Sequence, residues 1–243
     1  MGITRKIMFT CQKYASLAVV LSIIAFPAYA ENANDRLKEA SVVLNELMAI
    51  PDNGIPQDLL EKAHCAVIIP GAKKGGFFIG AQYGRGFAIC RDKNHRGWGA
   101  PAAVRLEGGT IGAQIGVAET DIFMLVMTEK GMNHLLESKF TLDANAGIAA
   151  GPVGRSSSAK TDAQFTAGIL SWSRSRGAFA GLTVGGGTLR NDLAENEELY
   201  GKPLTNKEVL NGAVKPPASA AGLIAALNRN SRTEEGVRAR EIK

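Results

Sequence analysis

The stretch from Gly108 to Met127 reads GGTIGAQIGVAETDIFMLVM and decides the fold class. Side chains alternate between the two faces of a strand, so as a strand its first half has one face of glycine and small or polar residues and one apolar face. Glycine weakens an isolated strand, and so much of it predicts close approach by another element or by a ligand. The end of the stretch, Ile122 to Met127, is continuously apolar and predicts burial on both faces.

A second segment nearly repeats the middle of this stretch. Ile79 to Gly84 reads IGAQYG and Ile111 to Gly116 reads IGAQIG, and the same glycine spacing recurs at Gly147/Gly151 and Gly181/Gly185. Polar residues interrupt these copies, and none lies in an apolar run long enough to span a bilayer as a helix. The spacing therefore predicts several similar strands packed on one another. The copies are short and unevenly spaced, so they support an internal duplication only weakly.

Residues 1–30 have the pattern of a bacterial secretory signal peptide. A basic start is followed by a short apolar run from Ala15 to Phe26 and by the small-x-small sequence Ala28-Tyr29-Ala30. We expect cleavage after Ala30 and a periplasmic or secreted mature protein; the alternative is an uncleaved anchor. The leader contains three basic residues and no acidic one, so the mature chain has 28 − 3 = 25 basic residues against 23 acidic ones, and its net charge falls from +5 to +2. This balance does not support nucleic-acid binding, which needs a concentrated basic face.

Two cysteines, Cys65 and Cys90, remain after the leader is removed. An even pair in an oxidising compartment indicates a possible disulfide. The alternative is a pair of small buried thiols. A bridge requires that the two positions face each other at close range.

Hydrophobic periodicity predicts a β-rich α+β fold. Its expected core is a twisted antiparallel sheet or barrel-like sandwich of glycine-rich strands, flanked by an N-terminal amphipathic helix and short C-terminal helices. We expect helices at residues 34–48, 56–63, 128–138, 207–210 and 220–227, and a helix or turn at 192–200. Thr128, Thr205 and Ser219 are the expected caps of the helices at 128–138, 207–210 and 220–227. Strands are expected at residues 65–69, 77–83, 87–91, 98–106, 108–127, 140–150, 164–173 and 178–184, with turns at residues 70–71, 73–76 and 84–86. The domain is expected to span residues 31–231, followed by a charged, disordered tail at 232–243.

The order of these signals from Leu37 to Leu227 resembles the SYLF lipid-binding domain family. The residues that carry the resemblance are Lys73-Lys74-Gly75-Gly76-Phe77, Gly80, Tyr83-Gly84-Arg85-Gly86, Trp98-Gly99-Ala100-Pro101, Gly108-Gly109, Gly112, Gln114-Ile115-Gly116, Asp121, Gly151-Pro152-Val153-Gly154-Arg155, Ser173-Arg174-Ser175-Arg176-Gly177, Phe179-Ala180-Gly181 and Tyr200-Gly201. The resemblance implies a non-enzymatic β-rich domain that binds membrane lipids. Eukaryotic members bind phosphoinositides and some touch actin. In a bacterial envelope the expected ligand is another phospholipid or lipid-like molecule.

Six basic residues in or beside expected turns are candidates for holding an anionic lipid headgroup: Lys73, Lys74, Arg85, Arg155, Arg174 and Arg176. Backbone N–H groups of glycine turns, with cations nearby, can hold a phosphate. The alternative is ordinary solubilising charge at the tips of hairpins. The N-terminal helix can lie on a membrane or pack over the glycine-rich strands, and its mixed charge favours packing.

Enzymatic function has little support in the sequence. No two of the histidines His64, His95 and His134 have metal-ligand spacing, and neither a G-x-S-x-G sequence nor a nucleotide-binding loop is present. We therefore expect no catalytic residue, metal or cofactor. The predicted function is binding of a phospholipid or a membrane surface in the bacterial envelope. The alternatives are a structural or adhesion protein that binds an envelope protein and, third, a periplasmic hydrolase.

Overall fold

The structure, a computed structural model, describes residues 31–50, 54–92, 97–142, 147–153, 167–175, 178–181 and 186–231, with the backbone alone at 77–79, 110–117 and 178–181. The chain divides into two compact units, Met1–Glu31 and Asn32–Lys243, and the fold belongs to the second. The predicted signal peptide and the predicted tail lie outside the described residues.

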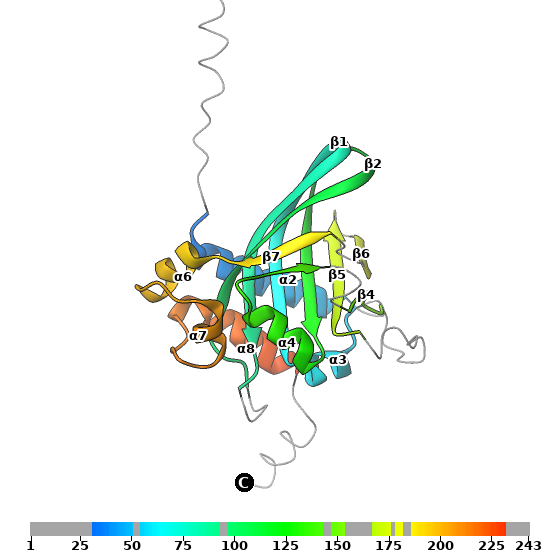
Figure 1. Cartoon of the computed structure of the whole chain (residues 1–243). Coiled ribbons are helices and arrows are strands. Elements are labelled where there is room, and N and C mark those ends of the chain that lie inside the picture. The colour runs from blue at the N-terminus through cyan, green and yellow to red at the C-terminus, as the bar shows by residue number, and fades with distance from the viewer. Residues whose placement is uncertain are drawn as a thin grey trace, which may run out of the picture. The chain divides into compact units, whose positions relative to one another are not determined.

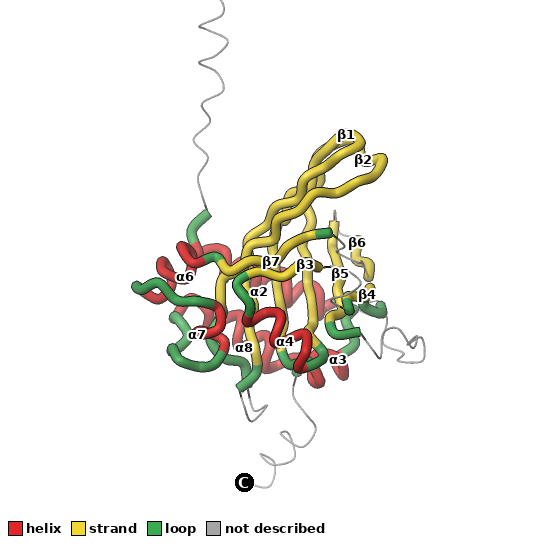
Figure 2. Tube along the Cα trace, in the orientation of Figure 1, coloured by secondary structure: helices red, strands yellow, loops and turns green. Residues whose placement is uncertain are grey.

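A seven-stranded sheet forms the centre of the fold (Figure 2). The strand order is β3-β7-β2-β5-β4, with β1 also paired to β2 and β6 to β5. All pairs are antiparallel except β4 with β5. The strands are β1 (Cys65–Cys90), β2 (Ala102–Val126), β3 (Lys139–Leu142), β4 (Ile148–Ala150), β5 (Ile169–Ser175), β6 (Ala178–Gly181) and β7 (Gly187–Asn191). The predicted β-rich α+β class is confirmed.

Strands β1 and β2 are much longer than the sequence predicts, and they pair with each other along most of their length (Figure 1). The turns expected at residues 73–76 and 84–86 are wrong, because both segments lie within β1. The expected end of a strand at Pro70-Gly71 is also wrong. A bulge between Ile69 and Ala72 absorbs these residues, and Gly71 takes a positive φ of 53° there.

Strand β1 doubles back on itself. A disulfide joins its first and last residues, Cys65 and Cys90, whose Cα atoms are 3.9 Å apart, so the structure has the first of the two alternatives for these cysteines. The second half of the strand lies directly against the first, because a Cβ added at Gly86 would meet the Ile68 carbonyl oxygen at 2.0 Å. The sequence predicts that glycine-rich strands are approached closely by another element or by a ligand. At Gly86 the close neighbour is another part of the same chain.

The sheet has an apolar core on each face. The inner core contains the cystine and side chains from six strands; it comprises Cys65, Val67, Ile69, Ala72, Ala88, Cys90, Val104, Leu106, Ile122, Met124, Val126, Leu135, Phe140, Leu142, Ile148, Ile169 and Leu189. The outer core lies under the helices and includes Phe87, Phe123 and Trp172 from the strands. Alternation along β2 assigns Phe123 to the outer core and Met124 to the inner one, so the predicted two-sided burial of Ile122 to Met127 is confirmed over the residues in β2.

Helices α2 (Ala33–Ala49), α3 (Gln57–Lys62) and α8 (Ala221–Asn230) supply the other side of the outer core. Helix α2 contacts both β1 and α8, and its buried residues recur at helical spacing: Ala33, Arg36, Leu37, Ala40, Val43, Leu44 and Leu47. Its strand partners are the apolar ends of β1 and β2, such as Ile68 and Phe123. The expectation that this helix packs over the glycine-rich middle of the strands is therefore corrected.

Three further helices, α4 (Glu129–Leu136), α6 (Leu193–Tyr200) and α7 (Asn206–Leu210), follow the predicted pattern. Thr128 and Thr205 cap α4 and α7 through their side chains, as predicted. The predicted cap at Ser219 is wrong: this residue lies in a short 3-10 helix, η3 (Ala218–Ala220), that leads directly into α8. No orphan amide is left there for the Ser219 hydroxyl to cap, because the backbone already turns helically before α8 begins.

The structure also divides one predicted strand and shows how the near-repeated segments are arranged. The strand predicted at residues 140–150 is two short strands, β3 and β4, in different parts of the sheet. The near-repeats at Ile79 and Ile111 are paired neighbours, because these two residues are partners in the β1–β2 register. Gly108, in turn, lies close to β7, where a Cβ would meet the Gly187 Cα at 2.8 Å.

Candidate functional site

The predicted headgroup residues Lys73 and Lys74 lie on β1, next to its glycine-rich middle. Lys73 is opposite Glu119 and Lys74 is opposite Ala118 in the register with β2. Consecutive strand residues point to opposite faces, so each face of the paired strands has one lysine. Lys73 is exposed and Lys74 is half-buried. Among the ion pairs formed by the described residues, none includes either lysine.

Arg174, the predicted cation on β5, is already paired within the fold. Its Nε and one terminal nitrogen donate to Asp121 Oδ2 at 2.9 and 2.6 Å, and its other terminal nitrogen donates to Glu46 of α2. Asp121 also accepts from the Gly71 amide at 3.0 Å, so this carboxylate links β1, β2 and β5. Burial opposes the charge on Arg174, but its hydrogen bonds to Glu46 and Asp121 outweigh that effect and raise its pKa.

Arg85, the predicted cation in the second half of β1, belongs to a buried charge cluster. Its Nε lies 2.9 Å from Asp192 Oδ2, without the alignment of a hydrogen bond, and 3.8 Å from Glu195 Oε2. Glu195 also accepts a hydrogen bond from Arg36 of α2, and Asp192 and Glu195 are each 2% exposed. Four charged side chains thus join α2, β1 and α6, and Arg85 has a structural role.

Burial disfavours the charged forms of both the acidic and the basic side chains in this cluster. It raises the pKa of Glu195, although Arg36 acts in the other direction. Burial also disfavours the charged guanidinium of Arg85, but Asp192, Tyr83 and Glu195 together outweigh burial and raise the pKa of Arg85. Arg36, Asp192 and Glu195 are not among the residues predicted from the sequence. Arg36 could have been found, since it occupies a position on the apolar face of an otherwise regular amphipathic helix.

Arg155 and Arg176, the remaining predicted headgroup residues, lie outside the described residues. The four predicted headgroup residues that the structure describes therefore divide into two classes. Arg85 and Arg174 bind carboxylates of the protein, whereas Lys73 and Lys74 lie together on one strand with no described ion pair. Glycine turns that could offer backbone amides to a phosphate are not present at Lys73 or Arg85, because both residues are in β1.

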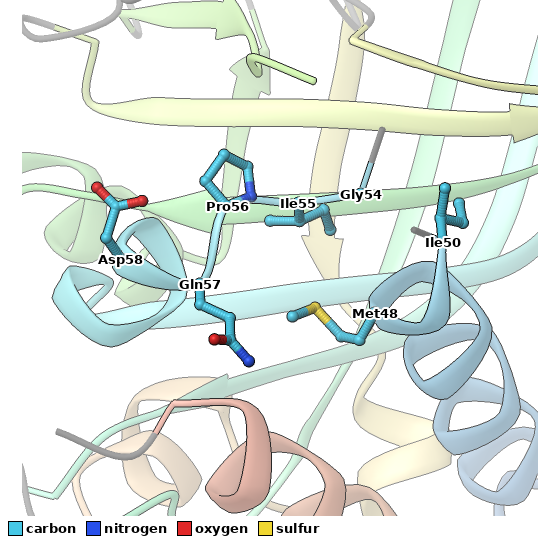
Figure 3. Close-up of a pocket in the computed structure, with 7 residues that line it drawn as sticks. All are labelled: Met48, Ile50, Gly54, Ile55, Pro56, Gln57 and Asp58. Atoms are coloured by element: carbon cyan, nitrogen blue, oxygen red, sulfur yellow. The ribbon is translucent and has the colours of Figure 1, made fainter. Parts of the chain in front are cut away.

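Two of the pockets lined by described residues bear on the search for a site. The larger has a volume of about 620 Å³ and lies between the end of α2 and the start of α3, lined by Met48, Ile50, Gly54, Ile55, Pro56, Gln57 and Asp58 (Figure 3). Met48 extends across it towards Gln57. The second, of about 430 Å³, lies beside Cys90 and includes Arg91, Asp92 and Glu129. Neither pocket is lined by a predicted headgroup cation.

Arg91 has structural partners in the second pocket. Its guanidinium donates to the carbonyl oxygens of Ala63 and Leu60, both at 3.0 Å, and lies 4.6 Å from the centre of the Trp98 ring. Burial lowers the pKa of Arg91. These contacts join the end of β1 to α3.

The described residues contain no group of three or more histidine, cysteine or acidic side chains able to hold a metal. His134 Nδ1 lies 3.2 Å from Glu137 on the surface of α4, and His95 is outside the described residues. Within the described part of the chain, no helix is long and apolar enough to cross a membrane. The fold is a helix-backed curled sheet whose long paired strands have a lysine on each face.

Comparison with known proteins identifies the family. Residues 107–230 match the family model described as Ysc84, Las17-binding protein actin regulator. LAS seventeen-binding protein 3 of Saccharomyces cerevisiae is 32% identical over 72% of this chain and 39% of its own length. The SH3 domain-containing YSC84-like protein 1 of Rattus norvegicus is 28% identical over 81% of this chain and 59% of its own length. The chain belongs to the Ysc84 family, which confirms the predicted SYLF relationship.

The chain matches only part of each of these relatives. A third, the SH3 domain-containing protein PJ696.02 of Schizosaccharomyces pombe, is 34% identical over 72% of this chain but over 41% of its own length. The matched region is thus the domain that these proteins share with this chain.

Proposed function

We propose that this protein is a non-enzymatic domain that binds a membrane surface containing anionic phospholipid. The observation that carries the proposal is the pair Lys73 and Lys74, which places a cation on each face of a long paired strand without a described carboxylate partner. Lysine ammonium groups near an anionic bilayer gain about 1 kcal/mol each. The resemblance of the sequence to the SYLF lipid-binding domain family supports the same function.

The chemistry of binding differs from the sequence-based expectation. Lys73 and Lys74 lie in an extended strand and not in a glycine turn, so the backbone amides around them do not converge to cradle a phosphate. The ammonium groups of Lys73 and Lys74 would make the headgroup contacts instead. A surface site is favoured over a cavity because the larger pocket is lined by Asp58 and by no basic residue among its described lining.

The test is sedimentation of the protein with vesicles of phosphatidylglycerol and phosphatidylcholine, with pure phosphatidylcholine as the reference. We expect binding to the anionic vesicles that weakens with salt, because exposed charges are screened. Replacing both lysines, Lys73→Gln with Lys74→Gln, is expected to weaken binding roughly thirtyfold. Lys62→Gln with Lys139→Gln is the matched control, since both are outside β1 and β2. Equal binding of the two double variants would refute the role of Lys73 and Lys74.

The location of the protein is also a proposal. We propose that residues 1–30 are removed after Ala30 and that the mature protein acts in a bacterial envelope, on the basis of the leader pattern in the sequence. Amino-terminal sequencing of protein from envelope fractions tests this directly. A mature chain that begins at Glu31 is the expected result, and an intact leader in a cytoplasmic fraction would contradict it.

A protein partner is the second candidate function. Relatives of this chain are named for binding Las17, and β3 pairs with β7 on one side alone among the described strands. An unpaired strand edge can accept a strand from another protein. Purification followed by lipid extraction and mass spectrometry separates the candidates: co-purified phospholipid supports the first, and a lipid-free protein that retains a protein partner supports the second.

A further inference from the structure

The middle of the paired strands β1 and β2 extends beyond the rest of the sheet (Figure 1). Strand β7 pairs with β2 only from Val104 to Gly108, and β5 pairs with it only from Asp121 to Val126. Between these segments, β2 pairs with β1 alone among the described strands. We call residues 72–82 of β1 and 108–120 of β2 the arm.

The arm is uncharged over most of its length. Residues 75–84 read GGFFIGAQYG and residues 108–118 read GGTIGAQIGVA, whereas 21% of the whole chain is charged. A two-stranded ribbon exposed to water is marginally stable, and glycine weakens it further. Ribbons that must stay in water are usually protected by charged side chains at their edges. The composition therefore indicates that the arm has a non-aqueous partner.

The tip of the arm is defined by the doubling of β1. The disulfide joins the two ends of this strand, so the bend lies near its middle. The register with β2 breaks there, between the pairs Phe77–Ile115 and Ile79–Ile111. The chain thus brings Phe77, Phe78 and Ile79 to the bend beside the isoleucine-containing segment of β2. Large apolar residue types are concentrated at the part of the arm farthest from the helices.

Basic residues outnumber acidic ones at the base of the arm. Residues 72–86 and 104–120 contain the four cations Lys73, Lys74, Arg85 and Arg105 and the two carboxylates Glu107 and Glu119. Glu107 is 2.5 Å from Arg105 and 3.1 Å from Arg190, and Arg85 is 2.9 Å from Asp192, so these charges are compensated within the fold. Lys73 and Lys74 remain, against the single carboxylate of Glu119. An apolar tip above a basic base matches the order of layers in an anionic bilayer, with acyl chains beneath phosphates.

We propose that the arm is the membrane-docking element and that its tip enters the interfacial layer of an anionic bilayer while Lys73 and Lys74 contact the phosphates. This inference rests on the proposed lipid-binding function and assigns it to a segment. Phe78 is four positions after Lys74, which corresponds to about 13 Å of extended strand, enough to reach the upper acyl chains. The unpaired outer edges of the ribbon exclude deeper insertion, because backbone groups without partners are costly in hydrocarbon.

The first experiment places a fluorescent residue at the tip of the full-length mature protein with Phe78→Trp. The native residues Trp98 and Trp172 are 6% and 0% exposed, so their emission is a constant background. On vesicles of phosphatidylglycerol and phosphatidylcholine, we expect a blue shift and quenching by lipids that carry a quencher high on the acyl chain. Leu193→Trp is the control, since Leu193 is 49% exposed on α6, away from the arm, and its emission should not change.

The second experiment adds a charge to the tip with Phe78→Asp. We expect vesicle binding to fall roughly tenfold or more, because a carboxylate is costly to transfer into the apolar layer. Val42→Asp, at a 53% exposed position on α2, is the matched control and should bind as the native protein does. The Phe78→Trp measurement keeps the proposal testable if Phe78→Asp does not fold.

The outcomes separate the arm from the lipid-binding function itself. If the native protein binds vesicles but Phe78→Trp shows no shift and Phe78→Asp binds normally, the arm proposal is overturned and lipid binding stands. If the native protein binds neither vesicle composition, both are overturned. If the emission of Phe78→Trp shifts without vesicles and the protein sediments as a dimer, the partner of the arm is a second copy of this chain and the membrane proposal is overturned.

Discussion

At the scale of single residues, the glycines of β1 are required by their distance to neighbouring backbone. A Cβ at Gly86 would meet the Ile68 carbonyl oxygen at 2.0 Å and the Ile69 Cα at 2.7 Å. Gly109 on β2 is the contrasting case, since the nearest atom to its added Cβ is the Gly80 carbonyl oxygen at 3.8 Å. One glycine is needed for packing, and the other has room for a side chain.

We therefore expect Gly86→Ala to destabilise the protein by about 3 kcal/mol or more, because neither strand segment can move without breaking its ladder. Gly109→Ala is the matched control and should change the free energy of unfolding by less than about 1 kcal/mol. Urea denaturation followed by circular dichroism measures both. Similar unfolding midpoints for the two variants would show that the halves of β1 are not in close contact.

The buried charges are the second feature at this scale. Arg36 and Glu195 have side-chain exposures of 9% and 2%, so removing the cation leaves a carboxylate in the interior. We expect Arg36→Met to cost about 3 to 5 kcal/mol at pH 7. Lys38→Met on the same helix removes an exposed pair with Asp35 and should cost less than about 1 kcal/mol.

The cost of Arg36→Met should depend on pH. Burial raises the pKa of Glu195 in the folded protein, and loss of the arginine removes an effect that lowers it. A folded-state pKa above the unfolded value gives stability that is present at acid pH and lost as the pH rises through the folded-state pKa. The deficit of the variant relative to the native protein should therefore shrink as the pH falls from 7 through the raised folded-state pKa of Glu195, which lies above the ordinary glutamate value of 4.5. A deficit that is constant between pH 4 and 7 would contradict this assignment.

At the scale of elements, the cystine determines the path of β1. It closes a segment with a sequence separation of 25 and joins the two ends of one strand within the inner core. The bridge keeps the two halves of the strand together, where Gly84 and Gly86 allow close contact. The bend that forms the arm depends on this arrangement.

Removing the bridge with Cys65→Ala and Cys90→Ala should destabilise the protein by about 3 to 4 kcal/mol, from the chain entropy of the opened segment. Hydrogen exchange should also show faster exchange in β1 and β2 near the bend than in β5. Thiol titration of the unfolded, unreduced native protein is the control and should find no free thiol in the mature chain. Two free thiols would show that the bridge does not form.

At the scale of the whole molecule, the two ends of the described chain complete one core. Leu37 and Leu44 of α2 pack in the outer core with Leu223 and Leu227 of α8. The indole nitrogen of Trp98 donates to Ser231 Oγ at 2.9 Å, which fixes the end of α8 to the sheet. Neither helix can be removed without exposing the apolar face of the sheet.

A chain that ends at Pro217 should therefore fail to fold, since the loss of two buried leucines alone costs about 4 to 10 kcal/mol, comparable with the total stability of a domain. A chain that ends at Ser231 is the matched control and should melt as the full chain does, because it keeps every described contact of α8. Calorimetry of the two truncations measures the difference. A cooperative transition in the shorter chain would show that the sheet is stable without α8.

The sequence determined the features that depend on neighbours along the chain. The spacing of apolar residues located α2 to within one residue at each end, and the threonines before α4 and α7 predicted their caps. Alternation predicted a strand over Gly108 to Met127, and the even cysteine count indicated the bridge. Each of these signals acts over a few residues, or follows from composition, and can be read without knowing the fold.

Only the tertiary structure decided what the glycines and arginines contact. The glycine segments of β1 were predicted as turns, but they are strand because another part of the chain lies against them, and glycine has no side chain that could reveal its neighbour. Arg85 and Arg174 meet carboxylates on distant segments, so their structural role was not visible in the local sequence. The glycine-rich strand pair extends beyond its neighbours because β5 and β7 pair only with the ends of β2, which is a property of the assembled sheet.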